Sequence, residues 1–354
     1  MEEAAGAGAG PGKWRTRWAA FRTSPFYPAC VLVLLIAAVA GLFAGSYTYT
    51  MANPTPRHIP TAVTGVPGSQ VKRAEFVAGM EKALGASLEL HHYDDFASAR
   101  EAVEAQKVFA ILQEPGPEPR PGPEPRSGPH PRLYLSSASG AAVAQLLAGA
   151  APRVGASLGV RVTVRDINPL QKGDPRGLTI FYISLAAVII GFVGAIQLSV
   201  NARELRPQER IGFIVAYALL GGFAICAVVD WGLGALRLPF AESWLILALT
   251  MFTSGMVFSM FNTLVGRWAM LPTWGLMVVL GNPSSGGAVS WPLLPSLLGT
   301  IGRWLPPGAS VNAQHTAVYF GGHQHAFPFV VLGAWAGVST AVFWFWRHRH
   351  PGGR

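Results

Sequence analysis

The sequence predicts a membrane protein: a six-helix α-helical transmembrane bundle with an extracytoplasmic α/β domain inserted between spans one and two. Three observations support this fold class. Of the 354 residues, 51% are hydrophobic and only 13% are charged, whereas a soluble domain carries about 25% charged residues. The apolar residues form long blocks, as in chains that fold in a lipid bilayer. The segment 51–177 lacks such blocks, and strand and helix patterns alternate along it.

Charge and cysteine usage exclude other classes. The formal net charge is +9, but the basic residues flank apolar blocks instead of forming one patch, so the lipid bilayer and not nucleic acid is the expected partner. The chain has 22 Arg and 5 Lys with abundant Ala, Gly and Pro, which indicates a GC-rich genome. Cys30 and Cys226 lie inside apolar blocks, where core packing is expected and a structural disulfide is not.

The N-terminal segment 1–27 is expected to be cytoplasmic and to contain an amphipathic helix. Trp14, Trp18 and Phe21 follow the spacing i, i+4, i+7, which places them on one helical face. Such a helix lies at the inner surface of the membrane. It either anchors the chain or offers the surface on which a cytoplasmic partner acts.

Six apolar blocks predict the spans, because a helix needs about 20 apolar residues to cross a bilayer. The first block, 28–47, gives span one at 28–50. Its long basic leader and long apolar core favour an uncleaved anchor over a cleaved signal peptide. The other five blocks lie within a transmembrane domain at 178–346, and the fifth is short and contains Pro272: 178–200, 211–233, 243–265, 268–280 and 326–346.

The distribution of basic residues predicts the orientation, because Lys and Arg concentrate in cytoplasmic loops. With both termini inside, the tail 347–354 is cytoplasmic and the two short outer loops hold only Arg237 and Arg303. The inner segments then hold eleven basic residues: Lys13, Arg15, Arg17, Arg22, Arg203, Arg206, Arg210, Arg267, Arg347, Arg349 and Arg354.

The segment 51–177 is predicted to fold as a small α/β domain with a mixed sheet. A Pro-rich arm at 115–132 repeats the unit PGPEPR and is expected to form an extended polyproline II segment. The arm is either a loop expansion or a docking element for a partner. The pattern predicts strands at 58–66, 87–93, 108–113, 132–137 and 160–167, and helices at 69–85, 94–107 and 139–159.

The stretch 281–325 is rich in Gly, Pro, Ser and Asn, and it follows the short fifth span. Its part 290–307 is apolar, but too short and too interrupted by Pro to cross a membrane. It is expected to form a re-entrant or interfacial hairpin on the outer face, with Trp291 and Trp304 as anchors at the headgroup level.

Polar residues in or near the spans are candidates for lining a substrate path or its outer mouth. The alternative is that the charged ones lie at the interface and the uncharged ones bond to neighbouring helices. Small residues in "GFVGA" and "LLGGFA" predict close helix contacts. The candidates for the substrate path are Asp230, Glu242, Asn262, Asn282, Ser284 and Ser285.

Catalytic motifs are absent from the sequence, so no enzyme activity and no catalytic residues are predicted. There is no GxxxxGK[ST] phosphate loop, no HExxH, no GxSxG and no CxxC. His315, His323 and His325 lie close in sequence and are of a type that binds Zn or Cu. Their spacing matches no strong metal motif, and no metal site is predicted.

At this point the chain resembles a known family. The stretch "GNPSSGG…LLPSLLGTIGRWLPPGASVNAQHTAVYF" (281–320) is similar to the Gly-Asn-Pro, Ser-Gly-Gly and Leu-Pro-Pro-Gly-Ala motifs of bacterial type-2 ABC transporter permeases, in the branch of the phage-infection-protein-like (YhgE/Pip) membrane proteins. The stretch "INPLQKGDPRGLTIFY" (167–182) resembles the junction between outside domain and second span in that family. The Pro-rich arm departs from the family pattern.

The resemblance implies a permease subunit in the plasma (inner) membrane of a bacterium. It forms a homodimer, or a heterodimer with a second permease, and couples to a separate cytoplasmic ABC ATPase, the subunit that uses ATP. The contact segments are then 13–26 and 201–210, although the second also reads as an ordinary basic inner loop. The candidate contact residues are Trp14, Arg15, Trp18, Arg203, Arg206 and Arg210.

The predicted function is therefore that of the membrane subunit of an ABC-type exporter, which moves an amphipathic or lipid-like substrate outward. The lack of strongly charged residues within the spans disfavours an ion-coupled transporter. The alternative is a non-transporting cell-surface scaffold or receptor that binds a partner through its extracytoplasmic domain.

Overall fold

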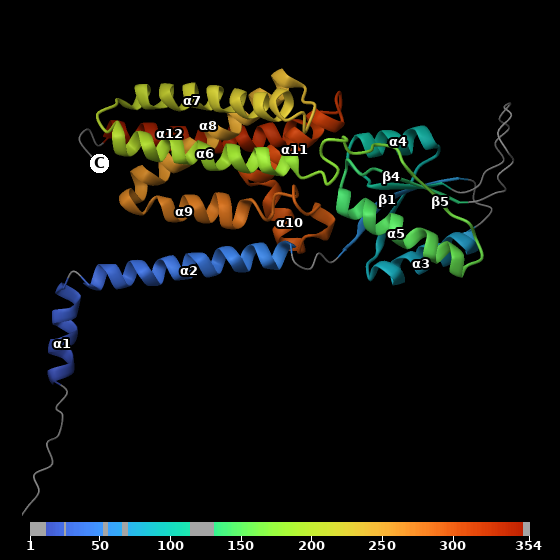
Figure 1. The fold of residues 1–354 in the computed structure, drawn as a ribbon, viewed down its shortest axis with the longest axis horizontal. Coiled ribbons are helices and arrows are strands. Elements are labelled where there is room, and N and C mark those ends of the chain that lie inside the picture. Colours follow the sequence, from blue (N-terminus) through green and yellow to red (C-terminus); the bar gives the residue numbers. More distant parts are fainter. Residues whose placement is uncertain (1–11, 25, 52–55, 66–69, 114–130, 350–354) are drawn as a thin grey trace, which may run out of the picture.

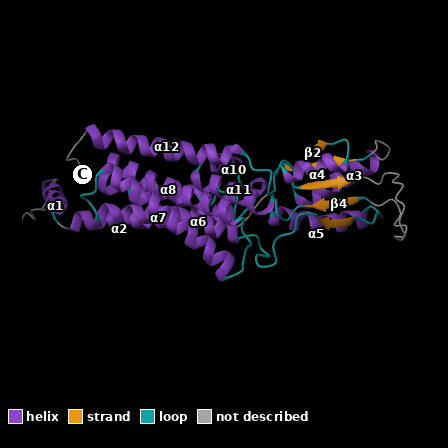
Figure 2. Ribbon diagram, turned by 90° about the horizontal axis from the view of Figure 1, so that it is seen from above, coloured by secondary structure: helices purple, strands orange, loops and turns teal. Residues whose placement is uncertain are grey.

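The computed structural model describes residues 12–24, 26–51, 56–65, 70–113 and 131–349. A helix bundle occupies one end of this part of the chain, and a β-sheet with its covering helices occupies the other (Figures 1 and 2). Nearly all of the predicted Pro-rich arm lies outside the described residues, as does the end of the basic tail at 350–354.

Five helices within the described residues are long and apolar enough to cross a membrane, which supports a multi-pass membrane protein. The predicted sixth span corresponds to α9 (Met270–Trp274) and the π-helical η4 (Gly275–Gly281), a shorter apolar segment. A sixth crossing is thus a proposal. The five long helices are α2 (Phe26–Met51), α6 (Thr179–Asn201), α7 (Pro207–Ala227) with π-helical η2 (Val228–Gly232), α8 (Phe240–Val265) with 3₁₀-helical η3 (Gly266–Trp268), and α12 (Ala326–Arg349).

Helix α8 is the centre of the bundle. Of its most apolar 18-residue stretch, 72% is buried inside the protein. Close packing on α8 depends on small residues. A Cβ atom at Gly191 of α6 would lie 2.6 Å from the carbonyl oxygen of Met251, and one at Gly222 of α7 would lie 2.9 Å from the nitrogen of Ala248. The predicted role of "GFVGA" and "LLGGFA" in close helix packing is therefore confirmed.

The sheet has five strands in the order β2-β1-β3-β4-β5. Strand β1 pairs in parallel with β2 and β3, β3 pairs antiparallel with β4, and β4 pairs in parallel with β5. The order of strands and helices matches the pattern read from the sequence. The elements are β1 (Ile59–Thr64), α3 (Gln70–Leu84), β2 (Leu88–His92), α4 (Phe96–Glu104), β3 (Ala110–Gln113), β4 (Arg132–Leu135), α5 (Ala141–Ser157) and β5 (Thr163–Asp166).

Side-chain alternation along the strands gives the sheet two apolar faces. Ile59, Val63 and Leu133 belong to the core under α3 and α5. Ala62 and Ile111 point to the opposite face and pack with residues of α4. Each face is therefore covered by helices, as expected for largely parallel strands.

A short segment, residues 290–293, fastens the bundle to the sheet domain, and we call it the docking strap. Leu293 is 1% exposed and belongs to the core of the sheet domain. The Trp291 ring lies 5.5 Å from that of Phe109, and the amide of Arg57 donates to the carbonyl of Pro292 at 3.0 Å. The strap thus connects η4 to the sheet domain by apolar packing and by backbone hydrogen bonding.

Helices α10 (Ser296–Arg303) and α11 (Pro306–Tyr319) follow the strap and form a hairpin in the sheet end of the bundle. Helix α11 is largely buried. Its Ser310 accepts a hydrogen bond from Thr250 of α8 at 2.8 Å, and its Gln314 donates to the carbonyl of Ser243 at 2.7 Å. The Ser310 hydroxyl and the Gln314 amide nitrogen of α11 thus find hydrogen-bond partners on α8, as buried polar groups require.

Close backbone contacts explain the glycines in this stretch. A Cβ atom at Gly302 would overlap the carbonyl oxygen of Ser284, and one at Gly308 would overlap the carbonyl oxygen of Gly302. At Gly281 it would lie 2.7 Å from the ring of Pro307. The segment thus folds back on itself at distances that only glycine permits.

Candidate functional site

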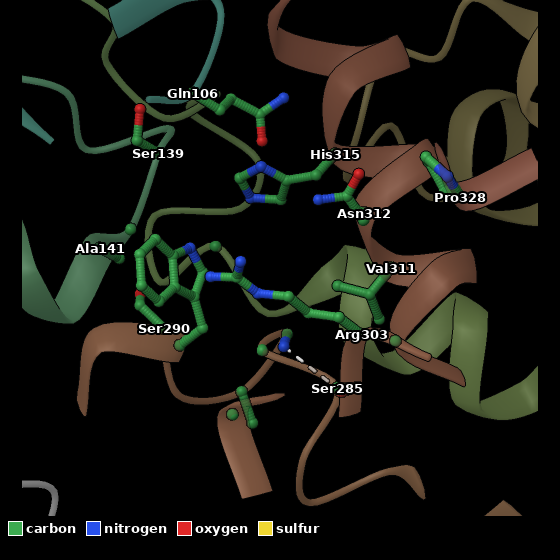
Figure 3. Close-up of a pocket in the computed structure, with 18 of the residues that line it drawn as sticks. Gln106, Ser139, Ala141, Ser285, Ser290, Arg303, Val311, Asn312, His315 and Pro328 are labelled. Atoms are coloured by element: carbon green, nitrogen blue, oxygen red, sulfur yellow. Dashed lines mark hydrogen bonds between the residues drawn. The ribbon is translucent and has the colours of Figure 1, made fainter. Parts of the chain in front are cut away.

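A cavity of about 520 Å³ lies between the sheet domain and the bundle (Figure 3). Its volume falls within the range of small-molecule sites, roughly 300–1,000 Å³. The walls come from four parts of the fold: the loops at the bundle end of the sheet, the segment leading into α6, the stretch from Ser284 to Trp291, and the facing parts of α10, α11 and α12. The α10–α11 hairpin and the strap thus build much of the cavity.

Arg303 supplies a positive charge at a defined position in the cavity. Its guanidinium carbon lies 4.1 Å from the centroid of the Trp291 ring, the geometry of a cation–π contact. Desolvation lowers the pKa of Arg303 below its ordinary value, but an arginine in a protein remains charged. Figure 3 shows its side chain extending across the cavity toward the side where Ala141 lies.

The lining contains a second arginine, Arg176, and no Asp or Glu. The carboxylates nearby are engaged elsewhere. Asp174 accepts hydrogen bonds from the amides of Leu178 and Thr179, at 3.0 and 2.9 Å, at the start of α6. Glu104 forms an ion pair with Arg100 at 3.0 Å. The lining therefore carries a net positive charge.

The start of α5 adds backbone donors to the same cavity. Its N-cap is Gly140, no side chain caps it, and Ala141 and Ala142 line the cavity. The first amides of a helix have no partner within the helix, and the helix dipole makes this end favourable for negative charge.

His315 also lines the cavity, from α11. Burial lowers the pKa of His315 from 6.5 to about 4, and the charge of Asp174 opposes this shift. At neutral pH the imidazole is therefore uncharged, and the positive charge of the lining comes from the arginines.

Exposed aromatic rings form another part of the lining. Trp304 is 60% exposed and Phe327 is 42% exposed, and their rings meet edge to face at 5.0 Å. The indole of Trp335 donates to the carbonyl of Trp304 at 2.9 Å, which fixes the backbone there. The cavity therefore combines cationic groups with an accessible apolar surface.

The structure brings some of the predicted site residues to this cavity. Ser284, Ser285, Trp291 and Trp304 line it. Asn282, 2% exposed, is not among the lining residues.

Three further candidates for the substrate path lie elsewhere in the bundle. Asp230 accepts a hydrogen bond from the amide of Leu238 at 3.3 Å, and Glu242 accepts one from Gln324 at 2.8 Å. Both lie near the sheet end of the bundle. Asn262 lies near the opposite end of α8.

The predicted ATPase-contact residues lie at the end of the bundle opposite the sheet domain. Figure 1 shows α1 (Gly12–Thr23), the α6–α7 turn and the last turn of α12 there. On α1, Trp14 and Trp18 stack at 6.1 Å and are exposed, and Arg15 is exposed as well.

The arginines of the α6–α7 turn differ in their surroundings. Arg203 is exposed. The amide of Arg206 donates to Glu209 at 2.8 Å, which closes the start of α7. Arg210 is 6% exposed, and its guanidinium donates to the carbonyl of Ala202 at 3.3 Å. Arg210 thus ties the turn to α6.

The three clustered histidines make different contacts. His323 faces Glu104 at 3.9 Å, and the Nε2 atom of His325 lies 3.2 Å from the carbonyl oxygen of Ala105. Within the described residues, no group of three His, Cys, Asp or Glu side chains could hold a metal ion.

Sequence reasoning did not assign Arg303 or Arg176 to a site. Arg303 appeared only as an outer-loop charge, and Arg176 only within the junction before α6. These arginines share a cavity because tertiary folding brings α10 and the segment that leads into α6 to the same lining, which no sequence period reveals. Comparison of the chain with protein-family models, with curated proteins and with solved structures finds no match in any of the three.

Proposed function

We propose that this chain is the integral membrane permease subunit of an ABC-type exporter, which works with a separate ATPase to move an amphipathic or lipid-like substrate outward. The observation that carries the proposal is the cavity of about 520 Å³ at the sheet end of the bundle. Cationic and exposed aromatic groups meet in it, as a molecule with one polar and one apolar part requires.

The separation of charge between the two ends of the bundle supports this function. Arginines gather at the end opposite the sheet domain, which the positive-inside rule assigns to the cytoplasm. The sheet domain and the cavity then face outward. The described chain begins and ends at the basic end, which fits an even number of crossings if Met270–Gly281 counts as one.

The energy for transport must come from another subunit in this proposal, because the sequence lacks a phosphate loop. The exposed aromatic face of α1 and the α6–α7 turn are the surfaces we assign to that ATPase. Dimerisation with an identical or a sister permease completes the assembly.

Site-specific photocrosslinking in native membranes tests this assignment. A photoreactive residue replaces Trp18 or Arg203 at the basic end, and Ala74 on α3 serves as the matched control in the sheet domain. We expect a nucleotide-binding subunit to be captured from Trp18 and Arg203 but not from Ala74. If saturating crosslinks capture only copies of this chain, or proteins bound through the sheet domain, the scaffold or receptor function replaces the permease.

A further inference from the structure

We propose that the cavity recognises the anionic headgroup of a single amphiphile, a phosphate or carboxylate attached to an apolar tail, and that Arg303 is its principal cation. Calling this amphiphile the transported substrate rests on the proposed function. The binding itself does not.

The charge of Arg303 is not compensated by a carboxylate of the described residues. Within the described part of the chain, no carboxylate oxygen lies within 4.0 Å of a side-chain nitrogen of Arg303 or Arg176. Within the same part of the chain, the Arg303 side chain donates no hydrogen bond to another residue. A guanidinium has five N–H donors, so these remain available to a ligand.

Arg303 is held in place before a ligand arrives. The Trp291 ring supports the guanidinium at 4.1 Å, and Trp291 itself packs on Phe109 at 5.5 Å. Its neighbour Leu293 is anchored in the core of the sheet domain. A cation stacked on an aromatic face keeps its in-plane N–H groups free for bidentate contact with phosphate or carboxylate. Little side-chain entropy is then lost on binding.

The charges around the cavity favour an anionic ligand. The lining has no acidic side chain, the Asp174 carboxylate is used at the start of α6, and His315 faces the cavity as a neutral ring. The uncapped start of α5 adds amide donors to the side of the cavity toward which Arg303 extends. A cationic ligand would find no countercharge in the lining.

Exposed aromatic rings in the cavity favour an amphiphile over a free anion. A site for inorganic phosphate alone needs no exposed aromatic surface, yet Trp304 and Phe327 line the same cavity and remain exposed. Both rings offer apolar contact to the tail of a ligand whose head lies on Arg303.

Direct binding to the purified full-length chain in nanodiscs tests this proposal. The probes are oleoyl lysophosphatidic acid, oleate, and monooleoylglycerol, which has the same tail without the anion. Inorganic phosphate is the competitor. We expect lysophosphatidic acid or oleate to bind at least about tenfold more tightly than monooleoylglycerol, and phosphate alone to compete only weakly. Equal binding of the charged and uncharged lipids, or full competition by phosphate, would overturn the proposal.

Variants locate the site. Arg303→Gln is expected to weaken binding of the anionic lipid about tenfold or more and to leave monooleoylglycerol unaffected. Arg303→Lys, which keeps the charge without the fork, should lie between. The matched control is Arg237→Gln, an exposed arginine at the same end of the bundle but outside the cavity, with unchanged binding expected. Should Arg303→Gln fail to fold, Arg303→Lys and Arg176→Gln give the same test. Unchanged affinity in these variants contradicts the proposal.

The lipid-binding measurement uses this chain alone, so its outcome does not depend on whether an ATPase subunit exists. Loss of lipid discrimination together with successful ATPase capture rejects the headgroup proposal alone. If Arg303 discriminates the anionic from the uncharged lipid but photocrosslinking captures no ATPase subunit, only the exporter proposal is rejected.

Discussion

Among the glycines in the described part of the chain, Gly302 has the closest backbone neighbour, because a Cβ atom there would overlap the carbonyl oxygen of Ser284. That obstacle is backbone, which cannot rotate away as a side chain can. The glycine therefore fixes how closely α10 lies against the segment that follows η4, and with it the wall of the cavity that carries Arg303.

Gly302→Ala is predicted to lower the free energy of unfolding by about 1–3 kcal/mol or more, as overpacked interiors do. Thermal unfolding of the detergent-solubilised protein measures this. The control is Gly337→Ala in α12, where no heavy atom lies within 4 Å of the added Cβ. This control should be neutral or stabilise by up to about 1 kcal/mol, since alanine favours helix. Equal effects at both positions would refute the close approach.

The burial of His315 predicts that the stability of the protein depends on pH. The pKa of His315 is about 4 in the folded protein and 6.5 in its ordinary state. Between these values the unfolded chain binds a proton that the folded chain does not, so the folded state loses stability as pH falls from 6.5 toward 4. We predict that His315→Gln removes this part of the pH dependence in thermal unfolding scans. The difference between variant and parent should be constant above pH 7.5. A difference that stays constant down to pH 4 would contradict the prediction.

The docking strap is the element that determines how the sheet domain lies on the bundle. Leu293 is buried in the core of the sheet domain. Leu297, four residues later on α10, is 69% exposed. The docking strap therefore inserts a side chain from the bundle into the core of the sheet domain.

Leu293→Ala is predicted to destabilise the docked sheet domain by about 2–5 kcal/mol, the cost of deleting a buried leucine side chain. Hydrogen exchange of β1, β3 and α5 should increase in this variant. Leu297→Ala, the matched control, should leave exchange in these elements unchanged. If exchange in the sheet responds equally to the two substitutions, the strap does not anchor the domain.

Periodic elements were predictable from the sequence, and so was a turn-rich hairpin within 290–307, but helix α11 was not. The strands and helices of the sheet domain follow period-2 and period-3.6 patterns, so their order could be read directly. Helix α11 could not, because Ser310, Gln314 and Thr316 lie at buried positions where a simple pattern expects apolar residues. Their hydrogen bonds to α8 and to Gln106 of the sheet domain stabilise the helix, and these are tertiary contacts. The same folding back of the chain hid the cavity that Arg303 and Arg176 share.

At the scale of the whole molecule, the two ends of the bundle differ in structure and in charge. One end carries the sheet domain and the cavity lined by Arg303 and Arg176, and the other carries the arginines of the α6–α7 turn and the aromatic face of α1. An exporter needs these ends on opposite sides of a membrane, with the ATPase at one and substrate release at the other. Their sidedness is thus the central claim.

Single-cysteine labelling tests the sidedness most directly. Both native cysteines are free, so Cys30→Ser with Cys226→Ala gives a background without thiols. Ala74→Cys on α3 and Gln208→Cys at the start of α7 then place one exposed thiol at each end. A membrane-impermeant maleimide is predicted to label Ala74→Cys in intact cells and Gln208→Cys only after permeabilisation. Labelling of both positions from the outside, or of Gln208→Cys alone, would contradict the account.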